Sequence, residues 1–163
     1  MEVRTGLGWD THRLGWGAEL ILGGVRIPSD RGQLGHSDAD VLSHAITDAL
    51  LGAAALGDIG MLFPDTDPKW KGADSAVFLK EAVRRVLAAG YTISNVDSTV
   101  ILEKPKLKDF RLKIRETLAA TIGIELDRVS VKFKTAEQVG PVGELRASEA
   151  EADRKSTRLN SSH

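Results

Sequence analysis

The sequence predicts an α+β fold in which one sheet carries helices on one of its faces. Segments rich in β-branched or alternating apolar residues are interspersed with segments whose apolar residues recur at the helical period. Their order lacks the regular strand–helix–strand repeat of a Rossmann domain, which favours an α+β arrangement over a doubly wound one. With 163 residues and no internal repeat, the chain is expected to form a single domain around one core.

The first predicted elements are a strand and a hairpin. Residues 3–9 alternate between apolar and other side chains and are predicted to form a short strand that ends near the sequence Asp-Thr-His. Residues 19–29 contain two short apolar runs separated by Gly23–Gly24, a pair that can adopt the positive φ of a tight turn.

A long helix is predicted over residues 36–57, where apolar side chains follow the helical period. Ser37 is expected to cap it, with Asp38 and Asp40 in the first turn, where the helix dipole favours negative charge. Gly57 is expected to end it.

The remaining elements are delimited by proline and glycine. Residues 58–72 are predicted to form a loop, because Pro64, Pro68 and Gly72 interrupt them. Further along, the sequence predicts a helix over 74–89, a strand over 91–103, a helix over 105–122 capped by Gly123, a strand over 127–135 and the start of another strand over 143–152.

Residues 153–163, DRKSTRLNSSH, differ in composition from the rest of the chain. They contain a single apolar residue, three basic residues and one acid. This segment is expected to be a non-native-looking polar tail, outside a domain of residues 1–152. The last strand would then be cut short, leaving an unpaired sheet edge, and His163 is given no role.

Composition excludes several classes of function. The net charge of −1 gives no sign of a nucleic-acid footprint, and the lack of cysteine excludes disulfides, thiolate chemistry and cysteine metal ligands. The sequence contains no apolar run of the roughly 20 residues that span a bilayer, and no signal-peptide core. A cytoplasmic protein with neither nucleic-acid nor membrane partners is expected.

Three residues are candidate metal ligands. Asp10 and His12 are two residues apart, so in a strand both side chains point to the same face. His44 lies between Asp40 and Asp48 at a spacing of four, which puts the three on one stripe of a helix. A helix packed on the first strand would bring His44 beside Asp10 and His12. One carboxylate and two imidazoles would supply three zinc ligands and leave a fourth position open, as in catalytic zinc sites.

The spacing alone leaves a plainer interpretation open. An Asp-x-His pair often serves only as a local hydrogen bond, and a helical histidine flanked by acids often lies on a charged, solvated face. Asp48 is correspondingly either a partner of His44 or a surface acid.

Longer segments resemble a known family. GWDTHRL, GHSDADVLSHAITDALLGAAALGDIGMLFPDTDPKWKGADS, EKPKL and KFKTAEQVG are similar to signatures of the 2-C-methyl-D-erythritol 2,4-cyclodiphosphate synthase family. The resemblance implies a homotrimer with active sites at the subunit interfaces. It also implies cyclisation of 4-diphosphocytidyl-2-C-methyl-D-erythritol 2-phosphate, with release of CMP, in non-mevalonate isoprenoid precursor biosynthesis.

The resemblance assigns metals to this reaction. Asp10, His12 and His44 match the family's zinc ligands, with one Zn²⁺ per active site. Glu137 matches the carboxylate that holds Mg²⁺ or Mn²⁺ with the substrate diphosphate, a role that suits a hard oxygen ligand.

The resemblance also assigns catalytic and substrate-binding residues. His36 and Thr135 match the residues that stabilise charge in the transition state. Leu102 to Lys108 match the cytosine pocket, and Phe63 to Asp67 a loop over the methylerythritol unit. The substrate-binding positions implied are Asp10, Thr11, His12, His36, Ser37, Asp58, Ile59, Gly60, Phe63, Pro64, Asp65, Thr66, Asp67, Leu102, Pro105, Lys106, Leu107, Lys134, Thr135, Ala136, Glu137 and Arg146.

The sequence departs from the family in two places. Where many members have an aromatic-Thr-Gly-Arg sequence, this chain has GPVGELR, so the phosphate-binding arginine is assigned to Arg146. Where members end in an apolar strand of the type EARAVVLL, this chain reads SEAEA and enters the polar tail.

Two other functions are compatible with the same residues. Clusters of His and Asp also build metal-dependent phosphohydrolases, although these usually use more ligands. A non-catalytic module that binds isoprenoid diphosphates is the other alternative. The products formed from the cytidine substrate would distinguish the synthase, the phosphohydrolase and the binding module.

Overall fold

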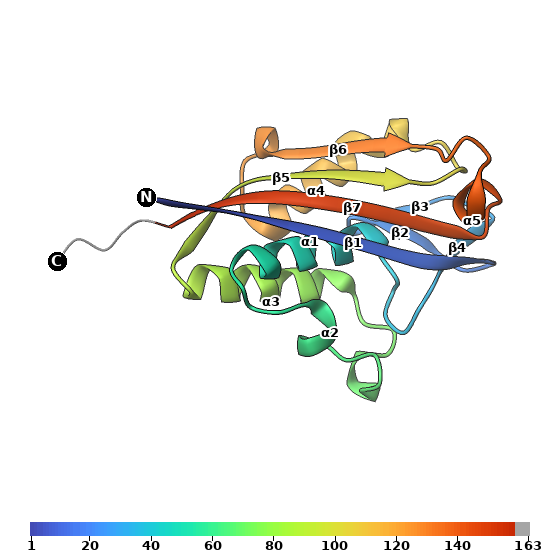
Figure 1. Ribbon diagram of the computed structural model, residues 1–163. Coiled ribbons are helices and arrows are strands. Elements are labelled where there is room, and N and C mark those ends of the chain that lie inside the picture. The colour runs from blue at the N-terminus through green and yellow to red at the C-terminus, as the bar shows by residue number, and fades with distance from the viewer. Residues whose placement is uncertain (159–163) are drawn as a thin grey trace.

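The computed structural model describes residues 1–158 and has an α+β fold (Figure 1). Its strands are β1 (Glu2–Trp16), β2 (Leu20–Leu22), β3 (Val25–Ile27), β4 (Arg31–Leu34), β5 (Tyr91–Ile101), β6 (Val129–Lys134) and β7 (Ala147–Arg158). The main sheet has the order β4-β1-β7-β5-β6, while β2 and β3 form a separate hairpin. Only the β5–β6 pair of the main sheet is parallel among these described strands.

The helices cover one face of this sheet (Figure 1). The longer ones are α1 (Val41–Ala53), α3 (Ser75–Ala88) and α4 (Arg111–Ile122); the short ones are α2 (Ile59–Leu62), α5 (Gly140–Gly143) and the 3₁₀ turns η1 (Pro68–Trp70), η2 (Lys108–Phe110) and η3 (Leu126–Arg128). Helix α1 packs on β1 and β7, α3 packs on α1, and α4 packs on β6. None of the helices in residues 1–158 is long and apolar enough to cross a membrane.

Two glycines of β1 allow α1 to lie directly against the strand. A Cβ atom at Gly8 would overlap the carbonyl oxygen of Ala45, and one at Gly6 would overlap that of Ala49. Any side chain at these positions would therefore push the helix away from the sheet. Because His44 precedes Ala45, the same close approach brings His44 to β1.

Helix α1 begins at Asp40 rather than at Ser37. The Asp40 side chain accepts the Ser43 N–H at 3.0 Å and also the N–H groups of Gly23 and Gly24, at 2.9 and 2.8 Å. The expected Ser37 cap is therefore wrong, because Asp40 is placed to satisfy both the helix terminus and the β2–β3 turn. Asp40 is the cap and not a residue of the first turn.

The end of α1 also differs from the expectation. The helix stops at Ala53 rather than at Gly57, since the chain turns at Ala55, which has a φ of 56°. The N–H of Leu56 then bonds to the carbonyl of Leu51 at 2.9 Å, which closes the helix end.

Several other expectations are confirmed. Gly23 and Gly24 take φ values of 59° and 82° in the hairpin turn, and Gly123 takes 83° at the end of α4. Asp74 caps α3, with its side chain accepting the Ala76 N–H at 2.9 Å.

Some boundaries differ. Strand β1 runs to Trp16, so Asp10 and His12 lie within the strand rather than at its end. Strand β4 was not expected, because its sequence RGQL carries no alternating apolar pattern. The predicted loop 58–72 contains α2 and η1, and the helix expected from Pro105 begins only at Arg111, after η2.

Strand β7 continues past Ala152 to Arg158, so the expectation of a strand cut short with an unpaired edge is wrong. Arg158 pairs with Glu2 of β1 and with Tyr91 of β5. Strand pairing uses backbone groups, so a polar sequence completes the ladder when both neighbours are present. Residues 159–163, including His163, lie outside the described residues.

Candidate functional site

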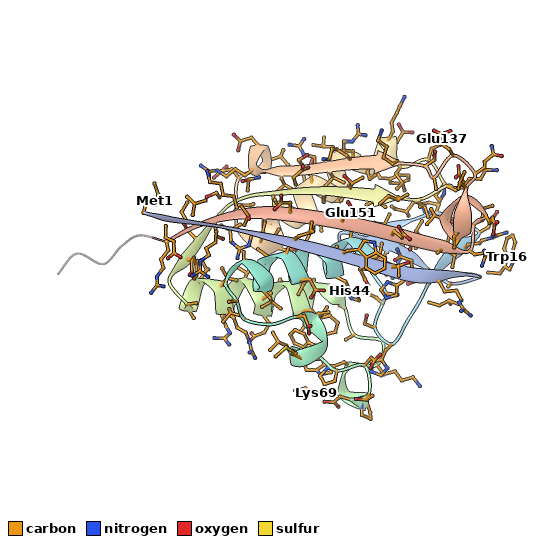
Figure 2. The ribbon with its side chains drawn as sticks, in the orientation of Figure 1. Met1, Trp16, His44, Lys69, Glu137 and Glu151 are labelled. Atoms are coloured by element: carbon orange, nitrogen blue, oxygen red, sulfur yellow. The ribbon has the colours of Figure 1, made fainter. Side chains whose placement is uncertain are left out.

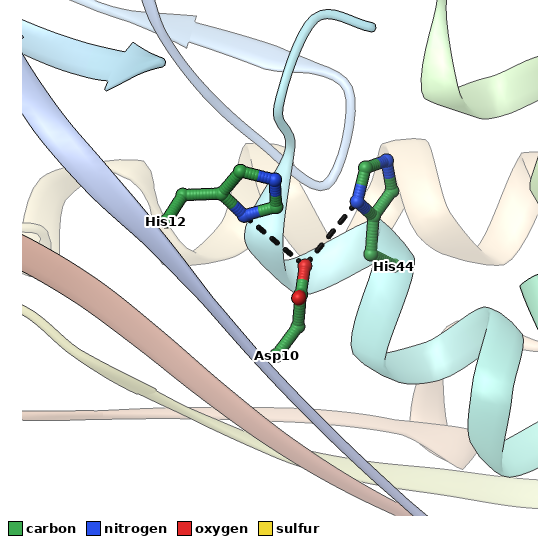
Figure 3. Close-up of side chains that lie close together, drawn as sticks. All are labelled: Asp10, His12 and His44. Carbon is green, nitrogen blue, oxygen red and sulfur yellow. Dashed lines mark ion pairs between the residues drawn. The ribbon is translucent and has the colours of Figure 1, made fainter. Parts of the chain in front are cut away.

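Asp10, His12 and His44 converge on one point (Figure 3). Strand β1 supplies the first two, on the same face because they alternate, and α1 supplies the third. Oδ2 of Asp10 lies 3.1 Å from Nδ1 of His12 and 3.2 Å from Nδ1 of His44. The expected proximity of the three residues is thus confirmed, with all three ligand atoms within 4.8 Å of one another.

The arrangement of these atoms fits a divalent metal. In a tetrahedral zinc site with ligand distances of 2.0–2.1 Å, neighbouring ligand atoms are about 3.3 Å apart. Oδ2 of Asp10 and Nδ1 of His12 are buried, and apart from the ion-pair contacts within the triad neither forms a hydrogen bond in residues 1–158. Buried polar atoms are normally paired, so a cation is the simplest partner for both.

The electrostatics of the triad favour an anionic Asp10. Burial raises the pKa of Asp10, but the adjoining rings of His12 and His44 outweigh burial and hold this pKa below its ordinary value. Burial lowers the pKa of His44, but Asp10, supported by Asp40 and Asp38, raises it above its ordinary value. A metal at this site would therefore compete with a proton for His44.

A cavity of about 470 Å³ opens beside the triad. Its aromatic wall consists of Phe63, Trp70 and Phe78, with ring centroids 5.1 Å apart for Phe63–Trp70 and 4.5 Å for Phe63–Phe78. The predicted site residues that line it are Asp10, His12, His36, Ser37, His44, Ile59, Gly60, Phe63, Pro64 and Asp65. A cluster of polar groups and an aromatic wall therefore face one space.

Two contacts hold the loops around this cavity. Nε2 of His36 lies 2.9 Å from the carbonyl oxygen of Asp67, so the helix-proximal loop is tied to the loop after α2. Oδ1 of Asp48 accepts the N–H of Ile59 at 2.8 Å. Of the two alternatives for Asp48, a direct hydrogen bond to His44 is therefore not found among residues 1–158; its carboxylate holds the start of α2 instead.

A second cavity, of about 460 Å³, lies at the other edge of the sheet. The predicted residues Leu102, Pro105, Lys106, Leu107, Lys134 and Thr135 line it. The peptide bond between Lys104 and Pro105 is cis. The backbone of Leu102 is held by an N–H bond of 2.9 Å to the Lys134 carbonyl, which joins the two chain segments that form the cavity.

The sheet register separates the two cavities. Asp10 pairs with Ala150, Ala150 with Val100, and Val100 with Phe133, which lines the second cavity. Three strand spacings amount to about 14 Å along the sheet. Within one subunit, the predicted site residues are therefore gathered into two groups rather than one.

Other predicted residues line neither cavity. Thr11 is exposed on the opposite face of β1, and Asp58 caps α2. Glu137 is exposed with a φ of 52°, and Figure 2 places it well away from His44. Arg146 is paired with Glu144 at the surface, with Nε 3.0 Å from Oε2. Thr66, Asp67 and Ala136 also lie outside both sets of lining residues.

Sequence reasoning missed some residues of both cavities. Trp70 and Phe78 complete the aromatic wall near the triad, and Arg111 and Phe133 line the second cavity. The guanidinium carbon of Arg111 lies 5.0 Å from the ring centroid of Phe133. Nothing in the sequence shows that Phe78 of α3 is a neighbour of His44.

Comparisons with known proteins agree with this picture. The YgbB family matches residues 3–153. A protein of Solibacter usitatus named 2-C-methyl-D-erythritol 2,4-cyclodiphosphate synthase is 67% identical over 151 residues, which cover 93% of this chain and 95% of the relative.

Two solved structures are similar along almost the whole chain. The bifunctional IspDF of Campylobacter jejuni matches 98% of this chain and 43% of its own, with 40% identity and a TM-score of 0.94. The IspF of Plasmodium falciparum in complex with CDP matches 97% of both chains, with 36% identity and a TM-score of 0.85. The resemblance found in the sequence is thereby confirmed: this chain belongs to the YgbB family, that of the 2-C-methyl-D-erythritol 2,4-cyclodiphosphate synthases.

Proposed function

We propose that this chain, as a homotrimer in the cytoplasm, converts 4-diphosphocytidyl-2-C-methyl-D-erythritol 2-phosphate into 2-C-methyl-D-erythritol 2,4-cyclodiphosphate and CMP. An oxygen of the 2-phosphate attacks the β-phosphorus of the diphosphate, and the bond from that phosphorus to CMP breaks. The observation that carries the proposal is the Asp10–His12–His44 triad beside a cavity, in a member of this family.

Two metal ions are assigned to this reaction. Asp10, His12 and His44 would hold Zn²⁺, and Glu137 would hold Mg²⁺ or Mn²⁺ together with the substrate diphosphate. Bound zinc supplies Lewis-acid polarisation of a phosphate oxygen. The anionic Asp10 and the two imidazoles suit zinc, whereas a carboxylate plus phosphates suits the harder cation.

The chain's own residues would orient the substrate. His36, held by the Asp67 carbonyl, and Thr135, at the end of β6, would stabilise the charge that develops on the phosphates. The residues that line the second cavity, from Leu102 to Leu107, would receive the cytosine. The CDP in the similar Plasmodium falciparum structure supports a cytidine nucleotide as ligand.

The separation of the two cavities supports a trimer. In a trimer, the second cavity of a neighbouring subunit would supply the cytosine pocket for a substrate bound at the triad. The face of the sheet opposite the helices is available for such contacts, since Val3, Leu7 and Trp9 of β1 are 52%, 74% and 52% exposed there. Exposed apolar patches of this kind commonly mark protein interfaces.

The reaction is tested with the cytidine substrate, zinc-loaded protein and Mg²⁺, followed by ³¹P NMR. Cyclic diphosphate with an equal amount of CMP is expected. Release of linear phosphate would identify a phosphohydrolase, and substrate that stays unchanged would identify a binding module. The His44→Ala variant, which removes one ligand of three, should lose both turnover and zinc.

The trimer is tested by light scattering. Leu7→Glu places a charge on the exposed sheet face and should yield a monomer that retains zinc but loses activity. Val77→Glu is the matched control, because Val77 is 48% exposed on α3 and away from the sheet. A Leu7→Glu protein that remains trimeric and active would contradict this interface.

A further inference from the structure

We infer that Ser75 and Asp38 are positioning residues for the metal site: together they hold the His44 ring so that its Nδ1 atom, and not Nε2, is free to bind the metal. The inference rests on the metal role proposed for His44. It adds two residues that belong neither to the metal ligands nor to the predicted substrate contacts.

The contacts form a chain from the triad to a carboxylate. Nε2 of His44 lies 2.7 Å from Oγ of Ser75. The Ser75 hydroxyl is hydrogen-bonded in turn to Oδ1 of Asp38, and the Ser75 N–H donates to Oδ2 of Asp38 at 3.0 Å. Ser75 is fully buried, so water does not compete for its single hydroxyl proton.

The direction of these hydrogen bonds follows from what each group can donate. The Asp38 carboxylate also accepts the N–H of Asp40 at 3.1 Å, so it acts throughout as an acceptor. The Ser75 hydroxyl must therefore give its proton to Asp38, which leaves its lone pair for His44. A neutral imidazole then carries its hydrogen on Nε2 and keeps the lone pair on Nδ1, the atom that faces Asp10 at 3.2 Å.

A second hydroxyl near His44 does not change this assignment. Oγ of Ser37 is 3.3 Å from Nε2 of His44, which is longer than the Ser75 contact. The Ser37 oxygen also accepts the N–H of Ala39 at 3.2 Å. Ser75 is therefore the nearer partner of His44, and its hydroxyl already donates its hydrogen bond to Asp38.

The backbone fixes both positioning residues. Ser75 is the first residue of α3, and Asp38 lies just before α1, where its N–H bonds to the Ala73 carbonyl at 3.0 Å. The pair therefore joins the N-terminal ends of the two helices. Phe78, one turn along α3, packs on the His44 ring with centroids 6.0 Å apart and limits its rotation.

The test measures zinc affinity rather than turnover. The apo proteins are titrated with Zn²⁺ against a chromophoric chelator. Ser75→Ala should bind zinc about 10–100-fold more weakly than the parent, the usual effect of removing a partner that orients a metal-bound histidine. Ser75→Thr keeps the hydroxyl and should recover most of the affinity. Asp38→Asn should weaken binding as well.

Ser98→Ala is the control for a lost buried hydroxyl, because Ser98 is buried in β5 and, within residues 1–158, its hydroxyl bonds only to the Ser130 carbonyl. It should leave zinc affinity unchanged. If Ser75→Ala folds poorly, the nitrogen bound to zinc in the parent protein is identified from ¹⁵N-histidine NMR. Binding through Nε2 of His44, or equal affinities of Ser75→Ala and the parent, would overturn the inference. Unchanged zinc in His44→Ala would instead overturn the metal role itself.

Discussion

Asp10 and His44 belong to different elements, yet Oδ2 of Asp10 lies 3.2 Å from Nδ1 of His44. The contact depends on how closely α1 approaches β1. That approach is possible because Gly6 and Gly8 of β1 present no side chain to the helix backbone. The candidate metal site is therefore coupled to the strand–helix packing that holds the domain together.

Gly8→Ala should damage both stability and metal binding. Its Cβ would overlap the carbonyl of Ala45, the residue after His44, so α1 must move. We expect the free energy of unfolding to fall by about 1–3 kcal/mol, as for other overpacked cores. Zinc affinity should fall at least tenfold, measured by chelator competition, because the third ligand moves away from the other two.

Gly52→Ala is the matched control. Gly52 lies in the same helix and is exposed, and outside the helix's own backbone no atom of the described residues lies within 4 Å of an added Cβ. Alanine there should raise the free energy of unfolding by roughly 0.5–1 kcal/mol without changing zinc affinity. A Gly8→Ala protein that is as stable as the parent and binds zinc equally would refute the coupling.

The local part of the site could be predicted from the sequence. Alternation along a strand is enough to put Asp10 and His12 on one face, and the helical period is enough to bury one side of α1. The direction of Asp40 could not be predicted. Its carboxylate turns to the N–H groups of Gly23 and Gly24, a long-range contact, so it does not share a stripe with His44.

The sequence also did not predict β4, the full length of β7 or the division of the site residues into two cavities, because each depends on partners distant in sequence. β4 forms because β1 extends far enough to pair with it, although RGQL has little strand character of its own. β7 continues through a polar sequence because β1 and β5 flank it on both sides. The division of the predicted residues into two cavities follows from strand order, which spacing along the chain does not reveal.

Asp48→Asn should reveal the cost of ionising a half-buried carboxylate. Burial raises the pKa of Asp48, as do the nearby carboxylates of Asp58 and Asp10, while the bond from Ile59 opposes this shift. A raised folded-state pKa means that the folded protein prefers the neutral acid, so ionised Asp48 lowers stability above that pKa. Asparagine keeps the acceptor for Ile59 without the charge.

The melting temperature of Asp48→Asn should therefore exceed that of the parent at pH 7. The difference should shrink as the pH falls through the raised pKa towards the ordinary value of 3.8, because Asp48 then becomes neutral as well. Asp48→Ala serves as the comparison, since it also releases the Ile59 N–H and should raise KM. A difference between Asp48→Asn and the parent that grows on acidification would contradict the sign of this shift.

Glu137→Gln should distinguish the roles proposed for the two metal ions. A neutral amide is a poorer ligand than a carboxylate for a hard cation that bridges phosphates. The variant should keep its zinc content, because Glu137 lies away from the triad, and should need far more Mg²⁺ for activity. Activity titrated against Mg²⁺, with zinc measured in parallel, checks both points; a parental Mg²⁺ dependence would remove Glu137 from the proposed role.

The inward side of β7 offers a matched pair of buried serines. We propose that residues 153–163 are foreign in sequence to the family, although they extend β7 to Arg158; the family match reaches only residue 153. Ser156 is fully buried, and its hydroxyl has no hydrogen-bond partner in the part of the chain that the structure describes. Ser148 is equally buried on the same strand, but its hydroxyl is hydrogen-bonded to the Gln33 side chain at 3.0 Å.

Alanine at these two positions should change stability in opposite directions. Ser156→Ala removes a desolvated hydroxyl that forms no bond, so the free energy of unfolding should rise by about 1 kcal/mol. Ser148→Ala breaks a hydrogen bond and leaves the Gln33 amide without one of its partners. The free energy of unfolding should therefore fall by about 1 kcal/mol or more. Urea denaturation of both variants measures the two values. If Ser156→Ala is as destabilising as Ser148→Ala, then Ser156 is satisfied in solution, and the polar end of β7 is as well accommodated as the rest of the strand.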